Sequence, residues 1–168
     1  MKNIKCILLD IDNTLTNTNE EITIETSDFF AKIRDKYYIV LVTGRTNSYA
    51  IEKSKTCNAS PIVISDNGAI IYNYETDEVL YSNFFEKEII NSIWDIAQKY
   101  NIECVFNTIY KRYRNNSYMN DKYLKNNNIG INGIDEVKDN VSQIVLFSSN
   151  EHEYKKCIEE IESLNNIE

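Results

Sequence analysis

The stretch Lys5–Asn17, KCILLDIDNTLTN, determines how the rest of this chain is interpreted. Its apolar residues Cys6–Leu9 follow one another without a polar interruption, which is typical of a strand buried on both faces inside a parallel sheet. The run ends in Asp10 and Asp12, and polar residues that can turn the chain come next. Because the carboxyl ends of strands carry the ligand sites of open α/β sheets, we expect both carboxylates to face one site.

Two crowded carboxylates restrict the chemistry of such a site. They cannot both ionise cheaply unless a cation lies between them, or unless one keeps a proton while the other attacks or ligates. Phosphoryl transfer with a magnesium ion is chemistry of this kind. An acidic turn after a buried strand, or a cation site without catalysis, explains the same residues, and at this point both alternatives stay open.

A crossover unit is predicted to follow the first strand. Thr23 can cap a helix in which Phe29, Ile33 and Tyr37 fall on one face. Next comes Tyr38–Val42, YIVLV, a second continuous apolar strand. Strand, helix and strand of these lengths form a parallel crossover, so the two strands end at the same edge of the sheet.

The residues after the second strand suit an anion. Thr43, Gly44 and Arg45 are expected at the same edge as Asp10, where a hydroxyl, an amide and a guanidinium can hold a phosphate. The alternative is a strand-to-helix turn that Thr43 or Asn47 caps. A helix over 47–56 and a short strand over 61–64 are predicted beyond it.

Two motifs now carry a resemblance to a known family. The pattern apolar-apolar-Asp-x-Asp-x-Thr resembles the first motif of the haloacid dehalogenase superfamily, and Thr-Gly-Arg resembles the second motif of its Cof-type phosphatase branch. The resemblance implies that Asp10 is the nucleophile and Asp12 the general acid/base. It implies Mg²⁺ held by the Asp10 carboxylate and the main-chain carbonyl of Asp12. It also implies that Thr43, Gly44 and Arg45 bind the phosphoryl group.

A third segment resembles the same branch. Asn67–Ala69 is similar to the Asn-Gly-Ala segment that leads from the core into a substrate-covering cap, and the resemblance places Asn67 near the active site. A plain turn in which Gly68 takes a positive φ explains these residues equally well. The chain beyond fits an α+β cap, with these expected elements: a hairpin of 69–72 and 79–82, a helix over 86–100, strands over 102–106 and 142–147, and a helix from Asn150.

The basic stretch Tyr110–Tyr123 is open to two interpretations. It contains Lys111, Arg112 and Arg114 in an otherwise acidic chain. It could reach over the core to grip a phosphorylated substrate, or it could be a solvated strand or loop.

The resemblance stops short of a whole family member. Such members return from the cap to further core strands, which bring a phosphoryl-binding Lys and an acidic pair for magnesium, and neither motif follows Leu146 in this sequence. The predicted fold is therefore α/β, with a partial HAD-like (Rossmannoid) parallel sheet over residues 1–68 and an α+β cap over 69–168. The chain looks truncated after the cap. Cys6–Leu9 is then expected at an open edge of the sheet.

The resemblance implies a Mg²⁺-dependent phosphomonoester hydrolase with an incomplete site in this chain. The alternative is a non-catalytic protein that binds a phosphorylated ligand or a partner protein. The expected partners are a phosphorylated small molecule and, at the open edge, either a second copy of the chain or a complementing polypeptide.

Composition limits the remaining possibilities. The 168 residues, 42% of them hydrophobic, suffice for one ordinary domain or a small core with a subdomain. A formal net charge of -8 argues against sequence-independent nucleic-acid binding and against attraction to anionic membranes. The apolar run before Asp10 is too short for a secretory or membrane-spanning segment, so we expect a cytoplasmic protein. The four cysteines form no zinc or disulfide pattern and are expected to be buried thiols.

Overall fold

The computed structural model describes residues 5–120 and 128–164. These residues form two compact units, Met1–Asn83 and Phe84–Glu168, and each unit has its own hydrophobic core. In the described part of the chain, no helix has the length and apolar character needed to cross a membrane.

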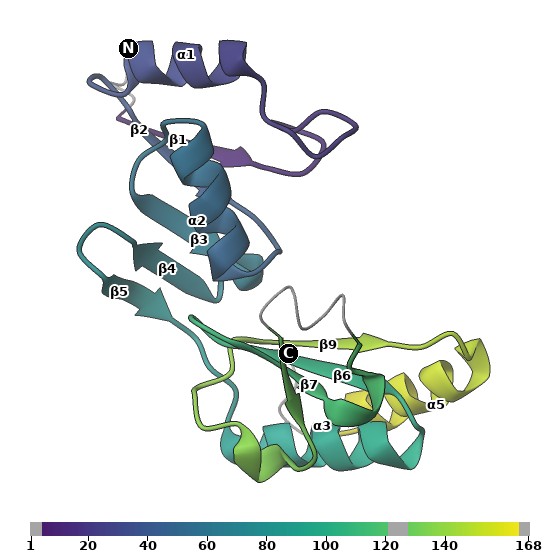
Figure 1. The fold of residues 1–168 in the computed structure, drawn as a ribbon. Helices are drawn as coiled ribbons and strands as arrows, with labels where there is room; N and C mark the ends of the chain where they lie inside the picture. The colour runs from purple at the N-terminus through teal and green to yellow at the C-terminus, as the bar shows by residue number, and fades with distance from the viewer. Residues whose placement is uncertain (1–4, 121–127, 165–168) are drawn as a thin grey trace. The chain divides into compact units, whose positions relative to one another are not determined.

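The first unit is built on one five-stranded sheet (Figure 1). The strand order is β1-β2-β3-β4-β5, with β1, β2 and β3 parallel and β4 and β5 antiparallel to their neighbours. The parallel β1–β2–β3 arrangement with intervening helices confirms the predicted α/β fold. The elements are β1 (Cys6–Asp10), α1 (Ile24–Ile33), β2 (Tyr38–Val42), α2 (Asn47–Thr56), β3 (Ile62–Ser65), β4 (Ile70–Asn73) and β5 (Glu78–Ser82), with a 3-10 turn at Asp66–Gly68.

Helix α1 begins where its cap predicts but buries a different phenylalanine. The Thr23 hydroxyl oxygen accepts a hydrogen bond from the Thr26 amide at 3.4 Å. Phe30 is 5% exposed and packs in the core, whereas Phe29, expected on the buried face, is 55% exposed. Neighbouring helical residues point about 100° apart, so only one of the two rings can face the core, and tertiary packing selects Phe30.

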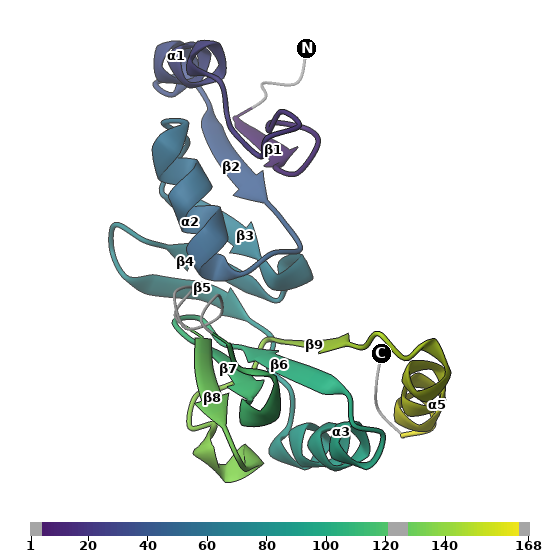
Figure 2. The ribbon, with the colours of Figure 1, turned by 45° about the vertical axis from the view of Figure 1, so that its right-hand side comes forward.

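Strand β1 lies at the edge of the sheet (Figure 2). It pairs with β2 alone among the described strands, and Leu8 is 60% exposed. The expectation that Cys6–Leu9 is buried on both faces is therefore wrong. β1 does lie at an open edge, as expected, but Cys6, Leu8 and Asp10, which alternate onto one face of the strand, are exposed because the described elements leave that face uncovered.

The hairpin of β4 and β5 continues this sheet. β4 runs antiparallel to β3 directly after the turn at residues 66–68, and the Asn83 amide donates to the Ala69 carbonyl at 2.8 Å. The first compact unit consequently ends at Asn83, whereas the sequence analysis grouped the hairpin with the cap. The immediate antiparallel return after a tight turn accounts for this difference.

The second unit is a four-stranded sheet with helices packed against it (Figure 2). Its core joins Trp94 and Phe106, whose ring centroids lie 6.1 Å apart. Helix α5 begins after Asn150, whose side chain accepts a hydrogen bond from the Glu153 amide at 3.3 Å, as the cap predicts. The elements are α3 (Lys87–Lys99), β6 (Glu103–Asn107), β7 (Arg112–Asn115), β8 (Asn128–Ile131), β9 (Gln143–Phe147) and α5 (Glu151–Glu162), with sheet order β8-β7-β6-β9 and 3-10 turns at Asn116–Tyr118 and Ile134–Glu136.

The basic stretch contains β7 and the 3-10 turn that follows it, and two of its charges form ion pairs within the unit. Arg114, whose side chain is 3% exposed, forms an ion pair with Glu103. Lys111 forms a 3.0 Å ion pair with Asp139. These contacts support the structural interpretation of the stretch, whose last residues, 121–123, lie outside the described residues.

Candidate active site

The candidate nucleophile ends the edge strand. Asp10 is exposed and lies opposite Val42 in the parallel register of β1 and β2, so it reaches the sheet edge just before Thr43. Its Oδ2 accepts a hydrogen bond from the Thr14 hydroxyl at 3.0 Å. Placing a carboxylate beside the end of the next strand is what the motif requires of Asp10.

A tight turn carries the chain away from Asp10. Ile11 is fully buried in the core of the first unit, and its carbonyl accepts hydrogen bonds from the amides of Leu15 at 2.9 Å and Thr16 at 3.1 Å. Asn13 takes a φ of 60°, a left-handed conformation that Asn tolerates better than most residues. The buried anchor and the left-handed turn together fix the backbone around Asp12.

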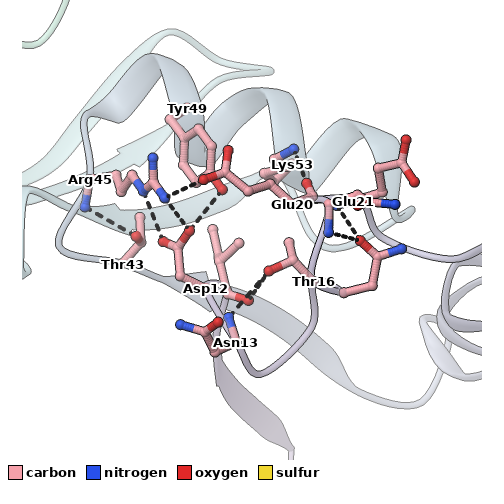
Figure 3. Close-up of polar contacts among 12 residues, drawn as sticks. Asp12, Asn13, Thr16, Glu20, Glu21, Thr43, Arg45, Tyr49 and Lys53 are labelled. Carbon is pink, nitrogen blue, oxygen red and sulfur yellow. Dashed lines mark hydrogen bonds and ion pairs between the residues drawn. The ribbon is translucent and has the colours of Figure 1, made fainter.

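The Asp12 carboxylate is held by two side chains from the other side of the site (Figure 3). Arg45 donates to it through both edges of its fork, from Nε to Oδ2 at 3.1 Å and from Nη2 to Oδ1 at 2.7 Å. The Tyr49 hydroxyl donates to Oδ1 at 3.1 Å. The structure thus brings two predicted site residues, Asp12 and Arg45, into direct contact.

The same Arg45 ties in the loop after the first motif (Figure 3). Its Nη2 also donates to Glu20 Oε1 at 3.2 Å, while Lys53 Nζ donates to the Glu20 carbonyl at 2.9 Å. The Tyr49 ring lies between these two cations, 4.8 Å from the Arg45 guanidinium carbon and 5.2 Å from Lys53 Nζ. Because the Arg45 side chain is 46% exposed, its ion pair with Asp12 stabilises the fold by no more than about 1 kcal/mol.

These contacts also shift the titration of the partners of Asp12. The hydrogen bond to Asp12 raises the pKa of Arg45 above its usual value. Burial, and then the hydrogen bond to the Asp12 carboxylate, raises the pKa of Tyr49 to about 12. Tyr49 therefore keeps its proton and remains a hydrogen-bond donor throughout the physiological pH range.

The second motif lies against the predicted turn at Asn67. Thr43 is 3% exposed, and its hydroxyl oxygen accepts a hydrogen bond from the Arg45 amide at 3.1 Å. The Asn67 amide donates to the Thr43 carbonyl at 3.3 Å, and a Cβ added at Gly44 would lie 2.4 Å from Asn67 Oδ1. Gly44 is therefore required for the close approach of Asn67.

The turn has the left-handed backbone that its sequence indicates. Gly68 has a φ of 93°, and Asp66 and Asn67 also take positive φ values of 51° and 57°. Gly68 has the positive φ of a plain tight turn. The same turn holds Asn67 next to Gly44, so the structure does not separate the two interpretations of Asn67.

Tyr49, Lys53 and Glu20 were not predicted as site residues. The helix predicted over 47–56 includes Tyr49 and Lys53 without giving them a role in the site, although their spacing provides a signal. Arg45, Tyr49 and Lys53 recur every four residues, with Arg45 just before α2 and the other two on it, and this spacing brings two cations to one tyrosine ring.

The donor set suits only a weakly held magnesium ion. Within residues 5–120 and 128–164, no three His, Cys, Asp or Glu side chains gather in a way that could hold a metal. The residues that could contribute are Asp10, through its carboxylate, and Asp12, through its carbonyl, because the Asp12 side chain is engaged by Arg45 and Tyr49. Mg²⁺ keeps several water ligands in many protein sites, so this small set fits the ion loosely.

The sequence of this chain matches a known protein family and is similar to known phosphatases. Residues 7–168 match the family described as haloacid dehalogenase-like hydrolase. The chain is 29% identical over 112 residues to the 5-amino-6-(5-phospho-D-ribitylamino)uracil phosphatase YcsE of Bacillus subtilis, covering 66% of this chain and 45% of that protein. It is 23% identical over 100 residues to the phosphoglycolate phosphatase of Archaeoglobus fulgidus, covering 59% and 43%. The chain thus spans less than half the length of these two relatives.

Solved structures show the same fold. A haloacid dehalogenase-like hydrolase from Bacteroides thetaiotaomicron superposes with a TM-score of 0.81 at 20% identity, covering 94% of this chain and 63% of that one. A protein from Thermotoga maritima gives a TM-score of 0.77 at 22% identity, covering 94% and 62%. With a family match that spans nearly all of its residues, this chain belongs to the haloacid dehalogenase-like hydrolases.

Proposed function

We propose that this chain provides the nucleophile and the phosphoryl-binding edge of a Mg²⁺-dependent phosphomonoester hydrolase. The observation that carries the proposal is the register of β1 and β2, which sets Asp10 beside the Thr43–Arg45 segment while Arg45 grips Asp12. A nucleophile, an acid/base group and a phosphate-binding turn at one sheet edge are the parts that phosphoryl transfer needs.

The proposed reaction has two steps. The Asp10 carboxylate attacks phosphorus, a phosphorus–oxygen bond forms to Asp10, and the ester bond to the leaving oxygen breaks while Asp12 delivers a proton to that oxygen. A water molecule then attacks the aspartyl-phosphate, and Asp12 accepts its proton. Inorganic phosphate leaves, Asp10 is again a free carboxylate, and Asp12, which begins the cycle as a carboxylic acid, is again protonated.

We propose that the second motif binds the transferred phosphoryl group. The Thr43 hydroxyl and the Gly44 backbone lie next to the carboxyl end of β1. Arg45 Nη1 makes no hydrogen bond within the described residues, so the guanidinium can contact a phosphate oxygen while its Nε and Nη2 hold Asp12. Asn67, beside Gly44, is proposed as a neighbour of the substrate.

Mg²⁺ is proposed as the cofactor, with Asp10 and the Asp12 carbonyl as its protein ligands. When bound, the ion would neutralise negative charge on the phosphoryl oxygens. The substrate is proposed to be a phosphorylated small molecule, as the names of the matched relatives state for those proteins.

The open edge of β1 is proposed to pair with a further strand, from a second copy or from a complementing polypeptide. Two observations support this proposal: no strand within residues 5–120 and 128–164 pairs with the outer side of Cys6–Asp10, and Leu8 is exposed. Sedimentation at tens of micromolar tests it together with amide exchange. A monodisperse monomer with slow exchange throughout Cys6–Leu9 would contradict it.

A turnover assay with Mg²⁺ and a panel of sugar phosphates tests the proposed function. Asp10→Asn should abolish phosphate release with the fold intact, because an amide of nearly the same shape cannot attack phosphorus. Asp28→Asn is the matched control, since Asp28 is an exposed carboxylate on α1. Unchanged turnover in folded Asp10→Asn would refute the assignment, and binding of a phosphorylated ligand without any turnover would favour the non-catalytic alternative.

A further inference from the structure

We propose that Tyr49 is a positioning residue, which acts with Arg45 to orient the Asp12 carboxylate so that Oδ2 carries the transferred proton. This inference rests on the proposed function, in which Asp12 is the acid/base group. It assigns a role to a residue that neither motif contains.

The hydrogen bonds distinguish the two oxygens of Asp12 (Figure 3). Among the residues that the structure describes, Oδ1 accepts from both Arg45 Nη2 and Tyr49, whereas Oδ2 accepts from Arg45 Nε alone. A carboxylate oxygen accepts about two hydrogen bonds through its lone pairs. Oδ1 is thus saturated, and the lone pair that remains for proton transfer lies on Oδ2.

Tyr49 is suited to this task by its surroundings. Arg45 and Lys53 lie over its ring, and Lys53 is itself held by the Glu20 carbonyl. The phenol is therefore fixed on α2 rather than free to rotate away. Its hydroxyl donates to Asp12 Oδ1 at 3.1 Å, so Tyr49 holds that oxygen in place.

A purely structural role for Tyr49 makes a different prediction. If Arg45, Tyr49 and Lys53 only hold the loop around Glu20 in place, loss of the Tyr49 hydroxyl should lower kcat/KM by the same factor for all substrates. If the hydroxyl orients an acid, the loss should depend on how much the leaving group needs a proton.

Two phosphate esters separate these roles when kcat/KM is measured, because that ratio reports the first chemical step. p-Nitrophenyl phosphate has a leaving group that departs without protonation, and glycerol phosphate has an alkoxide that needs the acid. Tyr49→Phe should lower kcat/KM by about tenfold or more for glycerol phosphate and by less than about threefold for p-nitrophenyl phosphate. Tyr81→Phe is the matched control, because Tyr81 is an exposed tyrosine on β5.

An equal loss for both esters in folded Tyr49→Phe, or no loss for either, would overturn the inference. Asp12→Asn supplies the reference, since it should show the same leaving-group dependence with a larger loss. Circular dichroism establishes that each variant is folded.

The hydrogen bond from Tyr49 to Asp12 is tested without turnover by NMR of the side-chain carboxyl carbon of Asp12 in labelled protein. Tyr49→Phe should move that resonance, because the hydroxyl that donates to Oδ1 is lost, whereas Tyr81→Phe should leave it in place. An unmoved Asp12 resonance in folded Tyr49→Phe would overturn this inference even if the wild type hydrolyses both esters. Absence of wild-type turnover would instead refute the proposed function and the acid role of Asp12 with it, so the two failures are distinguishable.

Discussion

Gly44→Ala tests the contact between the second motif and Asn67. A Cβ at this position would lie 2.4 Å from Asn67 Oδ1, closer than real Cβ contacts permit, and 3.4 Å from its Cγ. The backbone of Gly44 is not in the left-handed region, so alanine fits its φ and the cost comes from the contact alone. The contacted atom is the far end of the Asn67 side chain, so a rotation of that side chain relieves part of the contact.

The expected loss is about 1 kcal/mol in the free energy of unfolding, at the low end of the range for an added methyl in a filled space, because the Asn67 side chain can give way. Urea unfolding should be followed through NMR signals of amides in β2, because the only tryptophan, Trp94, lies in the second unit. Gly133→Ala is the matched control. Nothing lies within 4 Å of its added Cβ, so its effect should stay within about 0.5 kcal/mol.

The double variant decides whether Asn67 causes the loss. Asn67→Gly removes the side chain and keeps a residue that accepts positive φ. Gly44→Ala should therefore cost at least about 0.5 kcal/mol less in the Asn67→Gly background than in the wild type. An equal cost in both backgrounds would refute the placement of Asn67 beside Gly44.

Three further predictions concern the second unit and the metal. Glu103→Gln should destabilise the protein by about 3 kcal/mol in chemical unfolding, because it leaves the buried Arg114 charge without its carboxylate; a loss under about 1 kcal/mol would contradict the ion pair. Hydrogen bonds from Tyr113 and then Lys111 lower the pKa of Asp139 below 3.8, so wild type should be more stable than Asp139→Asn at neutral pH and should lose that advantage as pH falls below about 4; an advantage that grows with acid would contradict this sign. Calorimetry should show Mg²⁺ binding weaker than low micromolar, since the proposed protein ligands are one carboxylate and one carbonyl, and no three His, Cys, Asp or Glu side chains gather within the described residues; tighter binding would mean that further ligands exist.

Local sequence patterns predicted where helices and strands occur more accurately than they predicted which of their residues are buried. The caps at Thr23 and Asn150 mark helix starts because a side-chain oxygen satisfies an amide within one turn, which involves only neighbouring residues. Phe29 and Phe30 are adjacent and equally apolar, so the sequence alone does not decide which one meets the core. That choice depends on packing against strands distant in the sequence.

The exposure of β1 shows the same limit. An apolar run such as Cys6–Leu9 predicts a strand, yet its burial depends on neighbours that the run does not contain. The hairpin after residue 68 was correctly predicted as a hairpin, but nothing in its alternation says which sheet it joins. Sheet membership is a property of the assembled unit.

Some residues of the candidate site could be predicted from local sequence patterns, and others could not. Asp12 and Arg45 follow strands and could be placed at one edge from topology, and the structure brings them into contact. Tyr49 was missed because a tyrosine on a helix is usually part of a packed face, and its hydroxyl gives no local sign of a partner 37 positions earlier. The four-residue spacing from Arg45 through Tyr49 becomes informative only once Arg45 is known to bind Asp12, a contact between residues distant in the sequence.

The central claim, that Asp10 attacks phosphorus, is tested most directly by trapping the covalent intermediate. Protein incubated with Mg²⁺ and a phosphate ester is quenched and treated with borohydride, which reduces an aspartyl-phosphate to homoserine, and the peptide containing Asp10 and Asp12 is sequenced by mass spectrometry. The account predicts homoserine at Asp10 alone, and none in Asp10→Asn. Reduction at Asp12, or steady phosphate release with no reduced residue at Asp10, would contradict it.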